Sequence, residues 1–137
     1  MTSLLTEIDH VAIAVNDLDA AIAWYASVFG AEVVHREVVE SDGVDEALVK
    51  VAESYVQLLT PTRDDSPVAK YLAKHGEGLH HIAYRVDDCA VALEALKASG
   101  ARVIDQAPRP GSRGTTVAFV HPTSSFGTLI ELVEESR

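Results

Sequence analysis

An internal repeat constrains this chain more than any other feature of its sequence. The stretch IDHVAIAV at residues 8–15 aligns with GLHHIAYRV at residues 78–86 when His10 is placed over His81. The match resumes where GAEVV at residues 30–34 aligns with GARVI at residues 100–104. A repeat of about 70 residues in a chain of 137 indicates two copies of one supersecondary unit. The two copies share a histidine, which is the first chemical clue.

Length and composition favour one compact domain, or two half-domains that share a core. Cys89 is the only cysteine, so an internal disulfide is excluded and a reducing compartment is favoured. No apolar run approaches the about 20 residues of a membrane span. A net charge of −10 argues against binding to nucleic acid, because the chain has no basic stripe. We therefore expect a soluble, cytoplasmic protein with no membrane or nucleic-acid partner.

Hydrophobic periodicity predicts a similar order of elements in both halves. One helix is expected after Asp17, which caps it, and ends at Gly30. Its aromatic residues, among them Trp24 and Phe29, are interpreted as core. The predicted strands span residues 8–15, 33–39, 44–51, 55–60, 79–86, 103–105, 115–120 and 128–133. The other predicted helices span residues 68–75 and 88–99, and a loop is expected at 107–114.

This order predicts the α+β class, with two tandem βαβββ modules. The modules are expected at residues 8–60 and 78–134, with a linker at 61–77 that contains the short helix. Both modules are expected to rely on antiparallel pairing. One domain of 137 residues would then hold both repeats.

Four polar residues occupy matched positions inside the predicted strands. His10 corresponds to His81 in the first strands, and Gln57 corresponds to Glu131 in the last. A polar group within an apolar strand is costly unless it is partnered. Each residue alone is more often a hydrogen-bonded core residue or a surface position. Together, the four favour a six-coordinate divalent metal site with two open positions.

Three stretches resemble the vicinal oxygen chelate (glyoxalase-like) superfamily and, within it, the methylmalonyl-CoA epimerase family. They are IDHVAIAV, RDDSPVAKYLAKHGEGLHHIAYRV and FVHPTSSFGTLIELVE, and the resemblance covers essentially the whole chain. It implies a cup-shaped sheet around a metal site, usually in a homodimer. It also implies interconversion of the (2R) and (2S) epimers of methylmalonyl-CoA, as in propionate metabolism.

The same resemblance implies a divalent metal, commonly cobalt. The family's ligand positions fall on His10, Gln57, His81 and Glu131. Manganese, nickel and zinc suit the same donors. The expected substrate is therefore a small CoA thioester bound next to a metal ion.

Epimerisation at C2 favours one acid/base group on each face of the carbon. The resemblance implies Glu46 and Glu131 as this pair. The position of Glu46 follows from counting three residues after Gly43, and Glu40 or Asp45 is the alternative if that alignment slips. Glu131 would then serve as both metal ligand and base.

The glycine-rich loop at residues 111–114 is the expected substrate-binding segment. Backbone N–H groups of Ser112, Arg113 and Gly114 could hold the carboxylate or thioester, and a solvated loop is the alternative. The sequence does not select among the candidates for the CoA phosphates, which are Lys70, Lys74, Arg109 and Arg113. Ala12, Ala14 and Ala83 are expected to leave space for the acyl group.

Three other functions fit the same fold. Glyoxalase I would use the same metal on glutathione hemithioacetals. An extradiol dioxygenase would use two histidines and one glutamate on iron, which leaves Gln57 without a role. A non-enzymatic protein that sequesters antibiotics typically lacks the full ligand set. Because all four ligand positions are filled, the sequence favours an enzyme.

Overall fold

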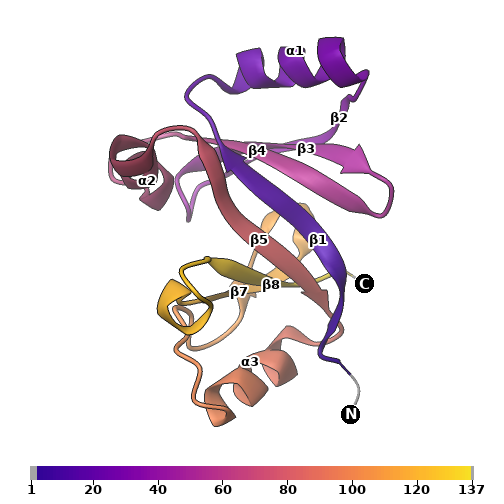
Figure 1. Cartoon of the computed structure of the whole chain (residues 1–137). Coiled ribbons are helices and arrows are strands. Elements are labelled where there is room, and N and C mark those ends of the chain that lie inside the picture. Colours follow the sequence, from indigo (N-terminus) through magenta and orange to yellow (C-terminus); the bar gives the residue numbers. More distant parts are fainter. Residues whose placement is uncertain (1–2, 137) are drawn as a thin grey trace. The chain divides into compact units, whose positions relative to one another are not determined.

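The computed structural model of the chain describes residues 3–136 and has the predicted α+β composition (Figure 1). The helices are α1 (Leu18–Phe29), α2 (Pro67–His75) and α3 (Cys89–Ala98). The strands are β1 (Leu5–Ala14), β2 (Val33–Val39), β3 (Val44–Val51), β4 (Ser54–Pro61), β5 (Gly78–Val86), β6 (Arg109–Pro110), β7 (Thr116–Val120) and β8 (Ile130–Glu134). Short 3-10 helices cover Ser112–Gly114 and Pro122–Ser124. None of the helices within residues 3–136 is long and apolar enough to cross a lipid bilayer.

The chain divides into two compact units. The central unit is Val11–His80. The terminal unit consists of residues 3–10 together with residues 81–136. Both β1 and β5 therefore run from one unit into the other. The division into modules at residues 8–60 and 78–134 stays a prediction.

In the central unit, β2, β3 and β4 form an antiparallel sheet, and β1 follows next to β4. The N–H of Val15 donates to the carbonyl of Leu59 at 2.9 Å. Helix α1 begins where the side chain of Asp17 accepts a hydrogen bond from the N–H of Ala20. It ends at Gly30, which has a left-handed φ of 64°. Both predicted caps are confirmed.

The two faces of this sheet are covered differently. Leu18 and the half-buried Tyr25 of α1 pack on the face that carries Leu58. Because side chains alternate along a strand, Leu59 projects from the other face, where it packs with Val68 of α2. The core of the central unit therefore lies on both sides of its sheet.

The prediction that Trp24 and Phe29 are core residues is wrong. Trp24 is 51% exposed and Phe29 is 64% exposed. Their rings contact each other edge-on, with the centroids 5.3 Å apart. A helix that packs on one sheet can bury only one stripe, and Leu18, Ile22 and Tyr25 fill that stripe.

In the terminal unit, the strand order is β1-β5-β8-β7-β6. Strand β7 pairs with β6 and β8 in the predicted antiparallel manner, but β5 and β8 are parallel. Helix α3 begins at Asp88, whose side chain accepts a hydrogen bond from the N–H of Val91. It packs through Cys89 and Leu93 against Leu132 of β8.

The segment before β7 differs from the prediction. The strand expected at residues 103–105 is reduced to a single bridge between Val103 and Val120. The carboxylate of Asp105 accepts a hydrogen bond at 2.8 Å from the N–H of Phe119, which competes with backbone pairing. The expected loop contains β6, and Pro110 limits that strand because proline has no N–H to donate.

Candidate metal centre

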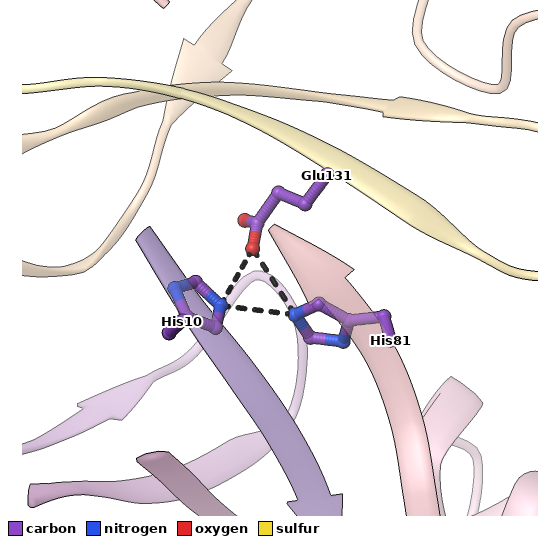
Figure 2. Close-up of side chains that lie close together, drawn as sticks. All are labelled: His10, His81 and Glu131. Atoms are coloured by element: carbon purple, nitrogen blue, oxygen red, sulfur yellow. Dashed lines mark hydrogen bonds and ion pairs between the residues drawn. The ribbon is translucent and has the colours of Figure 1, made fainter. Parts of the chain in front are cut away.

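Three buried side chains from three strands of the terminal unit meet at one point (Figure 2). His10 comes from β1, His81 from β5 and Glu131 from β8. The Nε2 atoms of the two histidines lie 3.1 Å apart. Oε1 of Glu131 lies 3.0 Å from Nε2 of His10 and 3.1 Å from Nε2 of His81. The structure thus brings together three of the four residues that the sequence predicts as metal ligands.

These donor atoms have the spacing that one divalent cation requires. Nitrogen and oxygen ligands bind such ions at about 2.0–2.2 Å, so two ligands at a right angle lie about 3 Å apart. Two imidazole nitrogens and a carboxylate oxygen also suit first-row transition metals. The three residues therefore fit a divalent metal ion.

Strand register explains why these groups meet. Glu131 is opposite Ala83 of β5 on one side and opposite Phe119 of β7 on the other. Because side chains alternate, His81 projects from the same face as Ala83 two residues later. Ala83 is completely buried. The ring of Phe119 contacts His81 edge-on, with the centroids 5.4 Å apart, and so limits the movement of that imidazole.

Asp9 has no predicted role, yet it lies at the centre of a buried ion network. Its carboxylate lies 2.7 Å from Nδ1 of His10. It accepts hydrogen bonds from Arg85 at 2.7 and 3.0 Å, and from Arg113 at 3.1 and 3.3 Å. Asp9 has no exposed surface. The only sequence signal is a carboxylate next to His10 in an otherwise apolar strand, where a buried charge needs partners.

The close packing of these groups shifts their pKa values. Burial would raise the pKa of Asp9, but hydrogen bonds from His10 and Arg85 outweigh burial and lower it to about 2. Burial would lower the pKa of His10, but its contacts with Asp9 and Glu131 raise it to about 9. Burial of Glu131 is likewise outweighed by hydrogen bonds from the two histidines, so its pKa lies below the usual value. We therefore expect His10 to be protonated at neutral pH when no metal is bound.

Because a metal ligand must be deprotonated, metal binding is expected to displace a proton from His10. Below the pKa of His10, about 9, the apparent metal affinity should therefore rise with pH. The expected rise is about tenfold per pH unit. Isothermal titration calorimetry in buffers of different ionisation enthalpy measures both the affinity and the released proton. The His10→Gln variant, which has no imidazole to deprotonate there, is the control. An affinity that is flat between about pH 6 and about pH 8 would contradict the protonated state.

Gln57, the fourth predicted ligand, belongs to the central unit and is 8% exposed. Its Nε2 donates a hydrogen bond to the carboxylate of Glu46, which is 2% exposed. Its Oε1 is buried and has no hydrogen-bond partner among residues 3–136. An unpaired buried oxygen costs about 1–3 kcal/mol, and a cation bound to it would remove that cost. This oxygen therefore fits a metal ligand.

The three acidic residues that the sequence offers as the second acid/base group have different surroundings. Glu46 is buried, with its carboxylate on Gln57. Asp45 projects from the opposite face of β3 and pairs with Arg36 at 3.1 Å. Glu40 has an exposed side chain at the turn between β2 and β3. Of the three, Glu40 is the most accessible to a substrate.

The predicted substrate-binding residues Ser112, Arg113 and Gly114 form a 3-10 helix. Arg113 has a left-handed backbone, with a φ of 56°. Its side chain is only 15% exposed, and its guanidinium contacts Asp9 and Glu135. The side chain of Arg113 therefore binds carboxylates of the protein itself, which makes it a poor candidate for the CoA phosphates.

The chain is similar in sequence to known proteins over most of its length. The profile of the Glyoxalase/Bleomycin resistance protein/Dioxygenase superfamily matches residues 9–119. The ethylmalonyl-CoA/methylmalonyl-CoA epimerase of Cereibacter sphaeroides is 39% identical over 131 residues, which span 94% of this chain and 98% of that relative. The chain belongs to the methylmalonyl-CoA epimerase family.

Solved structures of methylmalonyl-CoA epimerases have the same fold as this chain. The enzyme of Mycobacterium tuberculosis is 40% identical, with a TM-score of 0.96 over 100% of this chain and 93% of its own. A methylmalonyl-CoA epimerase in complex with methylmalonyl-CoA and NH4+ is 46% identical, with a TM-score of 0.94 over 96% of both chains. A probable lactoylglutathione lyase of Synechocystis sp. is 28% identical over 128 residues. The chain is thus more similar to methylmalonyl-CoA epimerases than to this glyoxalase-type relative.

Proposed function

We propose that this chain interconverts the (2R) and (2S) epimers of methylmalonyl-CoA by removing and returning the proton at C2. The observation that carries the proposal is the meeting of His10, His81 and Glu131 at one buried point. It occurs in a chain that is related over nearly its whole length to methylmalonyl-CoA epimerases. The protein is accordingly an isomerase that acts on a CoA thioester.

The position of the reacting carbon explains why a metal helps. C2 lies between a thioester carbonyl and a carboxylate, and its proton is too weakly acidic for a carboxylate base unless the enolate oxygen is stabilised. A divalent cation held by His10, His81, Glu131 and the amide oxygen of Gln57 would supply this stabilisation and orient the substrate. Cobalt is the proposed metal because the family commonly uses it, and manganese, nickel or zinc would suit the same donors.

Glu131 is proposed as one of the two acid/base groups. Both imidazoles approach its Oε1 atom. Oε2 makes no hydrogen bond or ion pair within residues 3–136, so it is available for proton transfer. As a metal ligand, Glu131 would be deprotonated, and a deprotonated carboxylate can accept the proton from C2.

Two residues are candidates for the second acid/base group. The sequence predicts Glu46, and this assignment remains a proposal. The hydrogen bond from Gln57 to Glu46 favours a different role, in which Glu46 holds the amide so that Oε1 of Gln57 stays available. We therefore propose Glu40, whose side chain is exposed, as the stronger candidate.

Backbone N–H groups of Ser112, Arg113 and Gly114 are proposed to hold the carboxylate or thioester of the substrate. Lys70, Lys74 and Arg109 remain candidates for the CoA phosphates. The family resemblance supports a cytoplasmic homodimer that acts in propionate metabolism.

Solvent deuterium exchange at C2 of methylmalonyl-CoA tests the proposed function. We expect rapid exchange in D2O with cobalt-loaded protein and little exchange after chelation, because proton abstraction depends on the metal. His81→Gln should lose the metal-dependent exchange. His121→Gln should keep it, because His121 instead caps the 3-10 helix at Pro122–Ser124. If no divalent metal supports exchange, the epimerase proposal is wrong and glutathione hemithioacetals become the next substrates to test.

A further inference from the structure

We propose that Asp9 is a positioning residue for the metal ligand His10, and that Arg113 joins Asp9 to the Ser112–Gly114 segment. The inference rests on the proposed metal site. It assigns a function to a buried ion network that neither the fold nor the proposed acid/base chemistry requires. The network consists of Asp9, Arg85 and Arg113, and the partly exposed Glu135 and Glu7 pair with these arginines at its edge.

The first contact orients the imidazole of His10. Its Nδ1 faces Oδ2 of Asp9 at 2.7 Å, while its Nε2 faces His81 and Glu131. A carboxylate at Nδ1 keeps the proton on that nitrogen, so the lone pair of a neutral ring is presented at Nε2. Asp9 therefore sets both the direction of the ring and the nitrogen that can bind a cation.

The second set of contacts fixes Asp9 itself. Arg85 and Arg113 approach its carboxylate, and each also contacts Glu135. Asp9 is completely buried, whereas the side chain of Glu135 is 38% exposed. Planar guanidinium groups hold a carboxylate in a defined direction, and the hydrogen bonds are stronger where water is excluded. The two arginines thus contribute to the position of His10 through Asp9.

Arg113 gives this network a link to the proposed substrate segment. It lies in the Ser112–Gly114 helix and has a φ of 56°, which a residue other than glycine keeps only when its surroundings hold it. Its contact with Asp9 supplies such a restraint. A shift of Ser112–Gly114 on substrate binding would therefore reach His10 through two contacts, from Arg113 to Asp9 and from Asp9 to His10. Metal affinity and substrate affinity are expected to be coupled.

The first test measures cobalt affinity by competition with a chelator, together with the visible absorption spectrum of bound Co²⁺. Asp9→Asn is expected to weaken metal binding by about 10–100-fold and to change the spectrum, because the ring loses its orienting charge. Glu135→Gln is the matched control, since Glu135 contacts both arginines but is not among the partners of His10. It should bind cobalt like the wild type. Unchanged affinity and spectrum in Asp9→Asn would overturn the proposal.

The second test concerns the link through Arg113. Arg113→Met keeps the pairing between Asp9 and Arg85. Its effect on cobalt affinity in the wild-type background can therefore be measured even if Asp9→Asn does not fold. It should weaken cobalt binding several-fold in the wild-type background and cause no further loss in Asp9→Asn. Unchanged affinity in Arg113→Met, or an equal loss in both backgrounds, would overturn the link.

These outcomes separate the inference from the proposed function. A wild-type protein that binds cobalt but does not exchange C2 protons refutes the epimerase and leaves the role of Asp9 to the affinity measurements. An active epimerase whose Asp9→Asn variant binds cobalt normally refutes only the role of Asp9. A wild-type protein that binds no divalent metal refutes both.

Discussion

Glutamine in place of Glu131 is expected to lower kcat by about 10²–10⁴-fold, even when metal is saturating. The substitution keeps the size of the side chain but removes the carboxylate that would exchange the proton with C2. It also removes an anionic donor 3.0 Å from His10 and 3.1 Å from His81, so a weaker metal affinity is expected as well. Steady-state kinetics over a cobalt titration separates the two losses.

Glu134→Gln is the matched control for this experiment. Glu134 lies on the same strand, but its carboxylate accepts a hydrogen bond from the N–H of Cys89 at the start of α3. Its loss should affect stability and leave turnover close to wild type. If cobalt-saturated Glu131→Gln turned over at the wild-type rate, Glu131 would be a metal ligand without a role in proton transfer.

The second large effect is expected from Glu40→Gln. Comparison with Glu46→Gln distinguishes the two candidates for the second acid/base group. Glu40→Gln should lower kcat by about 10²–10⁴-fold with metal affinity retained, as for a lost acid/base group. Glu46→Gln should weaken metal binding by about 10–100-fold, because the amide of Gln57 loses the carboxylate that orients it. At saturating cobalt its turnover should approach that of the wild type.

Deuterium exchange into each pure epimer tests the same assignment in another way. A protein that lacks one of its two acid/base groups should still abstract the C2 proton from one epimer and fail with the other. We expect this asymmetry in Glu40→Gln and not in Glu46→Gln. The asymmetry in Glu46→Gln alone, with normal cobalt affinity, would instead establish Glu46 as the second base.

Most elements of the fold were predictable because they depend on local patterns. Helix α1 has the expected caps at Asp17 and Gly30, and β2 and β3 have the expected bounds. The strand expected at residues 103–105 did not form, because the side chain of Asp105 takes a backbone donor of β7. The exposure of Trp24 was not predictable either, because the sequence of an apolar helix does not show how wide a stripe of it the sheet will cover.

The sequence by itself determined that His10, His81 and Glu131 would come together. In two copies of one unit, side chains at matched positions project from the same face of their strands. Polar residues at such positions therefore indicate a shared site. Only the tertiary structure decided what surrounds that site. Asp9 meets Arg85 and Arg113 across 76 and 104 residues of chain, and no local periodicity records such contacts. The direction of the Gln57 amide likewise depends on Glu46, because the pairing of β3 with β4 brings these two buried side chains within hydrogen-bonding distance.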